Sequence, residues 1–340
     1  MKTAVICFSD AGAALALKVC DLLGLDSADV HSIGKYAAKY GFTAHEKIAA
    51  DMGALFSAHD ALLFIGACGI AVRDIAPHLK SKTEDPAVLV LDDRGRYVIP
   101  ILSGHIGGAN ALAEDLAEKL GALAVVTTAT DGAGRFSCDG WAASHGCAIS
   151  SMEAAKAVSA AILTGDVPLT SEFPLPDSLP AGLIRGGEGP LGIYIGIRRR
   201  EPFVKTLRLI PRIVTLGIGC RRGIGSEAVR AAAEEALWAA GIDPRSVCRV
   251  ASIDVKREEA GLLACAAGIG AQPVFYTAEE LGAVPGDFAE SEFVKKTVGV
   301  GNVCERAAVL GSGGGELLVQ KTVREGVTVA AAASEWRAEF

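Results

Sequence analysis

The chain has 340 residues, enough for two or three domains that each bury a core of their own. Half of the residues are hydrophobic and 21% are charged, a composition that excludes a disordered chain. The formal net charge of −7 argues against general nucleic-acid binding, because that class of protein needs a basic surface.

The membrane and secreted classes are also disfavoured. The best apolar segment, 61–72, is flanked by Asp60 and Arg73 and is too short to span a bilayer. The first residues lack the long apolar region and cleavage site of a signal peptide. The nine cysteines include no C-x-x-C pair, which disfavours a zinc site, and we expect reduced thiols in a cytoplasmic protein.

The first part of the chain alternates short apolar strands with amphipathic helices. This alternation predicts a mostly parallel sheet with helices on both faces. A hairpin-type turn at 92–95 joins two of the strands. The expected strands are 3–8, 61–65, 87–91, 97–102 and 123–126, and the expected helices are 11–23, 44–58, one that ends near 76, and 111–120.

The pattern weakens after about residue 135. A helix at 152–163 and a strand at 192–197 flank a stretch rich in proline and glycine, so we expect a small middle segment. The basic run 198–200 fits a solvated hinge better than an anion-binding patch.

Regular alternation returns at residue 212. We therefore predict two Rossmann-like three-layer α/β/α domains with mostly parallel sheets, at 1–136 and 212–340, joined by a middle segment at 137–211. The expected strands of the second domain are 213–216, 247–253 and 274–276, its helices are 226–240, 258–267 and 303–310, and a closing hairpin pairs 316–320 with 327–332.

Loops that follow strands are the candidate binding regions, because ligands of open parallel sheets bind beyond the carboxyl ends of the strands. We expect 66–73, 103–110 and 127–131 to gather at one edge of the first sheet. We expect 217–223, 254–259 and 301–305 at one edge of the second. The candidate substrate-binding residues in these loops are Gly66, Gly69, Arg73, Ser103, Gly104, Gly107, Gly108, Asn110, Thr127, Thr128, Gly219, Arg221, Arg222, Asp254, Lys256, Glu259 and Glu305.

Most of these features also have a purely structural interpretation. Glycines after strands more often form tight turns than anion sites. No Walker lysine follows a glycine loop, and 217–223 has one residue too many for the dinucleotide fingerprint, so a nucleotide-dependent enzyme is disfavoured. His105 stands between Gly104 and Gly107 on a predicted turn, whereas the other five histidines look isolated.

Several motifs carry a family resemblance. They read GACGIAVRDIAP at 66–77, SK at 81–82, DPAV at 85–88, LSGHIGGAN at 102–110 and TTATD at 127–131. In this order they resemble the N-terminal part of the CbiG family, the cobalt-precorrin-5A hydrolases of anaerobic cobalamin biosynthesis. The second domain resembles the family's C-terminal module, which is shared with CobE proteins, through LGIGCRRG at 216–223, SIDVKREE at 252–259 and GNVCERAA at 301–308.

The resemblance implies a reaction. Water opens the ring A δ-lactone of a cobalt corrinoid, and the C20 carbon leaves with its methyl group as acetaldehyde. Because the substrate carries the cobalt, no metal site or other cofactor of the protein is implied. We assign the base to His105, with Asp131 as orienting partner or alternative base, and oxyanion binding to the amides near Gly107 and Gly108. A role of His105 as an axial cobalt ligand is the less favoured alternative.

A non-catalytic role is the main competing interpretation. The chain would then be a carrier that hands unstable corrinoids to other enzymes of the cobalamin pathway. In both interpretations the expected partner is the cobalt corrinoid, while a homodimer is left open.

Overall fold

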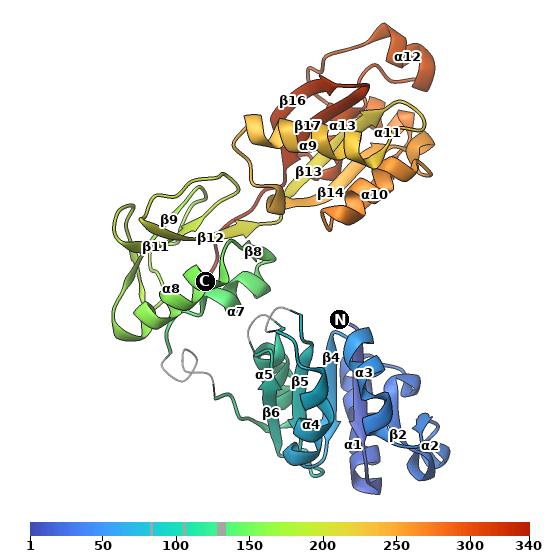
Figure 1. Ribbon diagram of the computed structural model, residues 1–340, viewed down its shortest axis with the longest axis vertical. Helices are drawn as coiled ribbons and strands as arrows, with labels where there is room; N and C mark the ends of the chain where they lie inside the picture. The colour runs from blue at the N-terminus through green and yellow to red at the C-terminus, as the bar shows by residue number, and fades with distance from the viewer. Residues whose placement is uncertain (82–83, 105–106, 128–133) are drawn as a thin grey trace. The chain divides into compact units, whose positions relative to one another are not determined.

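The computed structural model describes residues 1–81, 84–104, 107–127 and 134–340 (Figure 1). It divides the chain into two compact units, 1–144 and 145–340. Three sheets with packed helices form these units, which confirms the predicted α/β class. No helix within the described ranges has both the length and the apolar character needed to cross a bilayer.

The first unit contains a seven-stranded sheet with the order β3-β2-β1-β4-β5-β6-β7. Strands β1 to β5 are mutually parallel, β6 runs antiparallel to β5, and β7 is parallel to β6. The central strands are buried along their whole length, as expected of parallel strands covered on both faces. The strands are β1 (Thr3–Cys7), β2 (Val30–Ile33), β3 (Thr43–His45), β4 (Ala61–Ile65), β5 (Ala87–Leu91), β6 (Tyr97–Leu102) and β7 (Leu123–Ala124).

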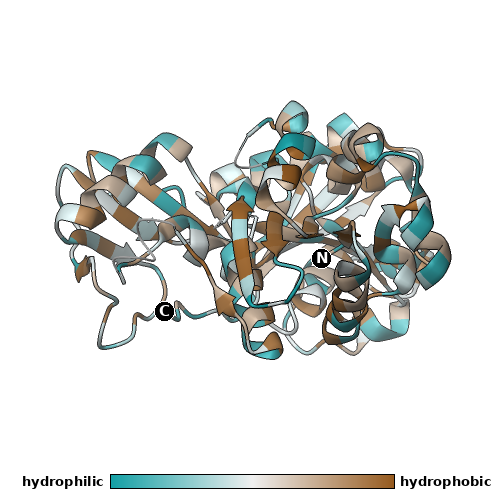
Figure 2. Ribbon diagram, turned by 90° about the horizontal axis from the view of Figure 1, so that it is seen from below, coloured by the Kyte–Doolittle hydropathy of each residue, from teal (hydrophilic) through white to brown (hydrophobic). Residues whose placement is uncertain are grey.

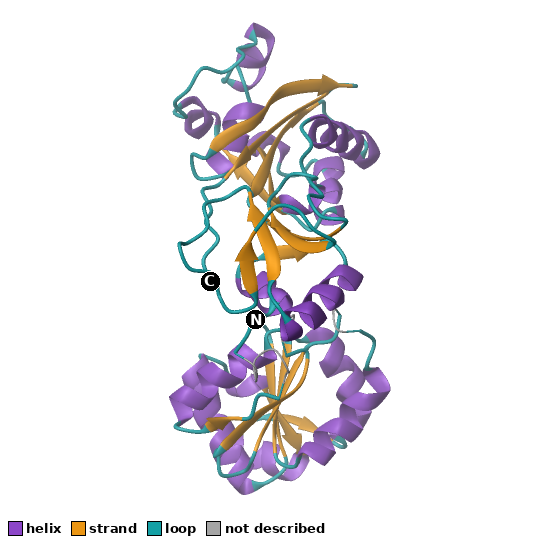
Figure 3. Cartoon of the chain, turned by 90° about the vertical axis from the view of Figure 1, so that its left-hand side faces the viewer, coloured by secondary structure: helices purple, strands orange, loops and turns teal. Residues whose placement is uncertain are grey.

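Helices cover both faces of this sheet (Figure 3). One face packs against α1 (Asp10–Leu23), α2 (Gly34–Tyr40) and α5 (Ala109–Leu120). The other packs against α3 (Ile48–Ala58) and α4 (Cys68–Ile75), and a further helix, α7 (Cys138–Ser144), follows β7 in the chain. The expected helix 44–58 is wrong at its start, because Thr43–His45 pairs with β2 as a strand.

The middle part of the chain forms a five-stranded sheet with the order β10-β9-β11-β12-β8. Four strands are parallel, and β8 pairs antiparallel with β12. Its elements are β8 (Cys147–Ile149), α8 (Met152–Thr164), β9 (Val167–Ser171), β10 (Leu183–Arg185), β11 (Leu191–Ile195) and β12 (Lys205–Pro211).

The C-terminal sheet has the order β15-β14-β13-β17-β16, with the closing hairpin confirmed as β16 and β17. Helices α9 and α10 pack on one face, and α11, α12 and α13 pack on the other. In each sheet the strands are mainly hydrophobic, as the colouring of Figure 2 shows. The elements are β13 (Val214–Cys220), α9 (Ser226–Ala239), β14 (Val247–Ile253), α10 (Ala260–Gly268), β15 (Gln272–Tyr276), α11 (Ala278–Gly282), α12 (Glu292–Val298), α13 (Cys304–Gly311), β16 (Glu316–Arg324) and β17 (Val327–Ala333).

A buried charged group joins the middle and C-terminal sheets. Asp243 is 3% exposed and forms ion pairs with Arg208 of β12 at 2.9 Å and with Arg245 at 2.7 Å. Arg245 also donates to the carbonyl of Ser150, just after β8. The Arg198 guanidinium donates to the Ala240 carbonyl at the end of α9. The basic run therefore begins with a residue that binds the C-terminal part of the unit, rather than with a fully solvated hinge.

Candidate functional site

The reversal at β6 separates loops that we expected at one edge of the first sheet. Because β6 is antiparallel to β5, its carboxyl end lies at the amino ends of β4 and β5. Gly66, Gly69 and Arg73 follow β4 at the carboxyl edge, whereas the 103–110 loop follows β6 at the opposite edge. Thr127 follows β7, which runs parallel to β6. The prediction that these loops share one edge is therefore wrong, since the hairpin at 92–95 reverses the chain.

The loop 103–110 is closed at its base by backbone hydrogen bonds. The Ala109 N–H donates to the Ser103 carbonyl at 3.2 Å, and the Asn110 N–H donates to the Gly104 carbonyl at 2.9 Å. Ser103 has a positive φ of 54°, a conformation that costs a residue other than glycine roughly 1–3 kcal/mol. Its hydroxyl donates to the Asp85 carbonyl at 2.9 Å, which helps to hold this conformation.

The glycines of this loop serve packing and turn geometry. A Cβ atom at Gly104 would lie 2.7 Å from the amide oxygen of the buried Asn110, and one at Gly107 would overlap Ser103. Gly108 has a φ of 81° and forms the N-cap of α5 without a side-chain bond. The N–H groups of Gly107 and Gly108 have no hydrogen-bond partner among the described residues. The loop therefore offers two donors of the kind that an oxyanion site requires.

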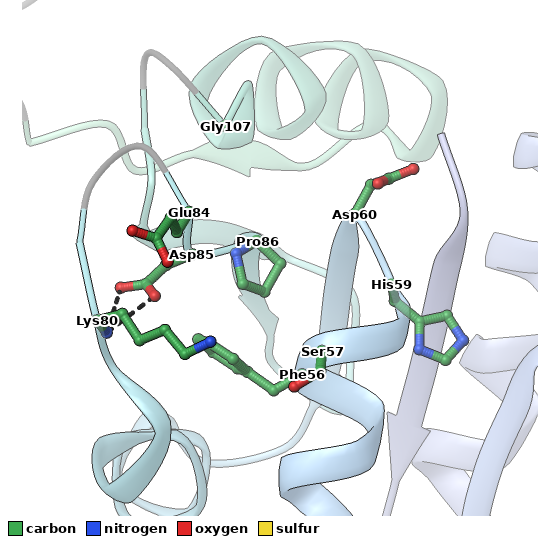
Figure 4. Close-up of a pocket in the computed structure, with 9 residues that line it drawn as sticks. All are labelled: Phe56, Ser57, His59, Asp60, Lys80, Glu84, Asp85, Pro86 and Gly107. Atoms are coloured by element: carbon green, nitrogen blue, oxygen red, sulfur yellow. Dashed lines mark hydrogen bonds between the residues drawn. The ribbon is translucent and has the colours of Figure 1, made fainter. Parts of the chain in front are cut away.

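A pocket of about 540 Å³ opens beside this loop, where β4 and β5 begin (Figure 4). Its walls come from the end of α3, the turn before β4, the segment before β5, and the loop after β6. The lining residues are Phe56, Ser57, His59, Asp60, Lys80, Glu84, Asp85, Pro86 and Gly107.

Asp85 connects the pocket wall to the 103–110 loop. Its carboxylate accepts the Lys80 N–H at 2.9 and 3.2 Å, and its own N–H donates to the Ser81 carbonyl at 3.0 Å. Its carbonyl accepts the Ser103 hydroxyl. With 8% of its surface exposed, Asp85 fixes the segment that precedes β5. The site prediction missed Asp85 and Lys80, although the DPAV motif was a signal for the former.

Three predicted residues, His105, Thr128 and Asp131, lie outside the residues that the structure describes. Their described chain neighbours differ in setting. Gly107 lines the pocket, and Thr127 is exposed after β7. The assignment of His105 and Asp131 as the candidate catalytic residues therefore stays a prediction from the sequence.

The opposite edge of the first sheet carries charged groups of both signs. The Gly66 N–H donates to the Leu91 carbonyl at 2.8 Å, and Arg73 lies on the exposed side of α4. Asp92 and Asp93 follow β5 at this edge, where the Ser9 hydroxyl donates to Asp93 at 3.1 Å.

In the second unit, the loops after β13 and β14 meet at one edge, as expected, because these strands are parallel. Arg221 and Arg222 are exposed there. Asp254 begins a short 3-10 turn, in which its carboxylate accepts the Val255 N–H at 2.8 Å. Two exposed guanidinium groups at a strand edge suit a ligand with several carboxylates.

Glu259 is held by donors from two of these loops. It accepts the Gly223 N–H at 2.8 Å and pairs with Lys256 at 3.1 Å, with both side chains largely covered. Desolvation of the Glu259 carboxyl raises its pKa, but the bonds from Lys256 and Gly223 outweigh this and hold the pKa below its usual range. Lys256 and Glu259 therefore brace the edge, since their charges neutralise each other.

Gly219 and Glu305 have structural surroundings. The Gly219 carbonyl accepts the Thr328 hydroxyl at 3.1 Å, and a Cβ atom at Gly219 would lie 2.6 Å from that hydroxyl. Glu305, 3% exposed, accepts the Lys321 N–H at 2.7 Å and the Asn302 side-chain amide at 2.5 Å. The structure thus places Glu305 inside the protein, as a link between the start of α13 and β16.

A histidine cluster was missed entirely by the sequence prediction. The His31 Nδ1 atom lies 2.9 Å from His45 Nε2, and His45 Nδ1 lies 2.7 Å from Asp51. The His59 ring stands edge-on to the His31 ring, with centroids 5.9 Å apart. The Asp51 carboxylate accepts from His45 Nδ1, and the tautomers of the two rings decide which ring donates in the His31–His45 hydrogen bond. His31 and His45 lie on β2 and β3, neither of which was predicted.

Comparisons with known proteins point to one family for both the N-terminal and the C-terminal part of the chain. Two family models match, Cobalamin synthesis G N-terminal over residues 51–131 and Cobalamin synthesis G C-terminus over residues 214–332. A cobalt-precorrin-5A hydrolase of Salmonella typhimurium is 36% identical over 343 residues, covering 96% of each chain. A cobalt-precorrin-5A hydrolase of Priestia megaterium is 30% identical over 298 residues, covering 82% of this chain and 79% of the relative.

A third relative matches a shorter part of the chain. Protein CobE of a Sinorhizobium species is 40% identical over 121 residues, which is 35% of this chain and 79% of CobE. The predicted resemblance to CobE is thereby confirmed for the C-terminal region. Because the similarity to the Salmonella protein extends over nearly all of both chains, this chain belongs to the CbiG family.

Proposed function

We propose that this chain is a cobalt-precorrin-5A hydrolase that opens the ring A δ-lactone of its substrate and releases the C20 fragment as acetaldehyde. The observation that carries this proposal is the 36% identity over 96% of both chains to a relative of that name. The pocket beside the 103–110 loop is the site that we assign to the reaction.

The chemistry has two parts. Water adds to the lactone carbonyl, and the ring oxygen leaves as an alcohol on C20. A base then removes the alcohol proton, so that the C–O bond becomes the aldehyde carbonyl. The electron pair of the broken carbon–carbon bond passes into the conjugated macrocycle. The site must therefore supply a base and donors to the lactone oxyanion.

The loop 103–110 offers suitable groups. The N–H groups of Gly107 and Gly108, which donate to none of the residues that the structure describes, would bind the oxyanion, and Gly107 lines the pocket. We assign the base to His105 because it follows Gly104 within this loop, and we keep Asp131 as its orienting partner or as the alternative base. The cobalt belongs to the substrate, so this mechanism uses no cofactor of the protein.

The direct test is incubation of the protein with cobalt-precorrin-5A, with acetaldehyde measured by coupled NADH oxidation. We expect one acetaldehyde per corrinoid consumed. H105A should slow release by at least about a hundredfold, the lower range for loss of a general base. If H105A opened the lactone at the wild-type rate, the base assignment would be wrong. Tight corrinoid binding without acetaldehyde would instead support the carrier role.

A further inference from the structure

We propose that Ser103 is a positioning residue of the pocket in the first unit: it acts on the ligand through Gly107, whose place in the pocket wall it fixes. That the Gly107 N–H donates to the lactone oxyanion rests on the proposed function. The positioning itself rests on the backbone, the hydrogen bond and the contacts of Ser103.

The backbone of Ser103 has a conformation that is unusual for its place in the fold. In the described part of the chain, Ser103 and Glu325 are the two residues other than glycine with a positive φ, at 54° and 47°. Glu325 and Gly326 form the two-residue turn between β16 and β17, where positive φ angles are usual. Ser103 lies between a strand and a helix, so its strained backbone needs another explanation.

One hydrogen bond holds the Ser103 conformation in place. The Ser103 hydroxyl donates to the Asp85 carbonyl at 2.9 Å, which joins the end of β6 to the segment that precedes β5. Asp85 is itself fixed, because its carboxylate accepts the Lys80 N–H at 2.9 and 3.2 Å. The hydroxyl proton is thus committed to a backbone carbonyl, and the described residues that line the pocket do not include Ser103. Ser103 is therefore suited to anchor the wall rather than to bind the ligand.

Gly107 is pressed against the anchored serine. A Cβ atom at Gly107 would lie 2.4 Å from the Ser103 Cβ atom, 2.9 Å from the Ser103 carbonyl oxygen and 3.4 Å from the Ala87 nitrogen. The Ala109 N–H also donates to the Ser103 carbonyl at 3.2 Å. A change in the Ser103 backbone would therefore displace Gly107, which lines the pocket together with Asp85 (Figure 4).

This contact explains why a serine occupies a position whose φ favours glycine. Glycine would accept the positive φ without strain, but it would lack the bond to Asp85 and would leave the backbone free to adopt other conformations. An oxyanion donor is effective only when it is held in place, because a displacement of about 1 Å can slow a reaction by roughly a hundredfold. The serine therefore favours a fixed Gly107 over an unstrained backbone.

The test compares S103G, S103A and S32A with wild type. Ser32 is the matched control, because its buried hydroxyl also donates to a backbone carbonyl, that of Cys7, but at the carboxyl edge of the same sheet. S103G should melt about 2–4 °C above S103A, since glycine tolerates the positive φ. In acetaldehyde release, we expect the kcat of S103G and of S103A to fall about tenfold or more with an unchanged KM. S32A should keep the kcat of wild type.

Amide hydrogen exchange gives a second readout that needs no substrate. The Ala109 and Asn110 N–H groups donate to the carbonyls of Ser103 and Gly104. They should exchange about fivefold faster in both Ser103 variants and at the wild-type rate in S32A, because one hydrogen bond that closes this segment is lost only in the former. If wild type releases no acetaldehyde, the proposed function fails, whereas faster exchange still supports the positioning by Ser103.

Four results would overturn the proposal. The first is a wild-type kcat in S103G or S103A. The second is a raised KM with an unchanged kcat, which would make Ser103 a ligand contact. The third is exchange at Ala109 and Asn110 that neither Ser103 substitution changes. The fourth is an S32A variant that loses as much kcat as S103A, because a general loss of stability would then explain both.

Discussion

His31 is the buried centre of a hydrogen-bonded group formed with His45, Asp51 and His59. It is 8% exposed, and burial is the main reason that its pKa falls from 6.5 to about 4, with the neighbouring histidines adding to the shift. The folded state therefore holds a neutral His31 down to a lower pH than the unfolded chain does. This difference links the stability of the first unit to pH.

Acidification should weaken the first unit through His31. The stabilisation by neutral His31 is complete above pH 6.5, which is the pKa of this histidine in the unfolded chain. It is lost as the pH falls toward about 4, the pKa of His31 in the folded protein. The shift corresponds to a loss on the order of 3 kcal/mol in the free energy of unfolding. Urea unfolding followed between these pH values checks this.

Two variants show whether His31 is responsible. H31N should lose most of this pH dependence, whereas H78N, in a histidine outside the cluster, should keep it. If the wild-type unit unfolds with the same free energy at both ends of the range, the account of His31 is wrong. NMR of the imidazole nitrogens checks the same point without a substitution, since His31 should stay neutral to about pH 4.

Two glycines on opposite edges of the first sheet test the placement of the site. A side chain at Gly107 would overlap Ser103, while nothing lies within 4 Å of the Cβ position at Gly69 in α4. We expect G107A to lose about 1–3 kcal/mol of stability and nearly all acetaldehyde release. G69A should retain activity and gain about 0.5–1 kcal/mol, because alanine favours a helix.

Thermal unfolding and the acetaldehyde assay measure both effects. If the G69A variant is as inactive as G107A, the active site lies instead at the carboxyl edge of the sheet, where we first expected Gly66 and Arg73 to act.

At the scale of elements, α13 lies directly on β13. A Cβ atom at Gly217 would overlap the Cys304 carbonyl at the start of that helix. The glycines of the 217–223 stretch therefore include one that is required for helix–sheet contact. In the sequence, a glycine that is needed for such a close approach looks like part of a ligand-binding fingerprint, although here its cause is packing.

G217A should destabilise the second unit strongly. The new methyl group meets backbone atoms, which cannot rotate away, so we expect a loss of about 3 kcal/mol or more. G268A, at the open end of α10, is the matched control and should be neutral or stabilising. Chemical unfolding of both variants measures the difference. An equal stability of the two would contradict the packing that we describe.

The sequence predicted elements where one pattern dominated. β4 and β5 are apolar throughout, β1 is apolar after Thr3, and all three strands were found. β2 was missed because it reads Val-His-Ser-Ile, with polar side chains that only the fold brings into contact. β12 was missed because Lys205 and Arg208 break its apolar pattern, and the partner of Arg208 lies far along the chain.

The candidate site was predictable only in part. The sequence identified the 103–110 loop, and it even identified the hairpin at 92–95. That hairpin reverses the direction of β6, and this reversal decides which loops are neighbours. We did not infer the reversal from the sequence. Lys80 gains its place in the pocket wall from segments that meet in space, so spacing along the chain carried no signal for it, whereas the DPAV motif marked Asp85.

At the scale of the whole molecule, the second unit depends on the buried Asp243. Desolvation raises its pKa, but the hydrogen bonds from Arg245 and the charge of Arg208 outweigh this and hold it below the usual range. We expect D243A to cost about 3 kcal/mol or more, because two arginines lose their buried partner. D177N, in an exposed loop, should change stability by less than about 0.5 kcal/mol.

Chemical unfolding of the two variants measures this contrast. A D243A protein as stable as D177N would show that the middle and C-terminal sheets are joined by packing alone.

The most direct test of the central claim is the reaction of cobalt-precorrin-5A in water enriched in oxygen-18. Attack of water on the lactone carbonyl predicts one labelled oxygen in the ring A acetate of the corrinoid product, with acetaldehyde formed in equal amount. Mass spectrometry of the corrinoid reads the label. A labelled product with acetaldehyde supports a hydrolase that opens the lactone. An unlabelled corrinoid, or no acetaldehyde, would contradict the account.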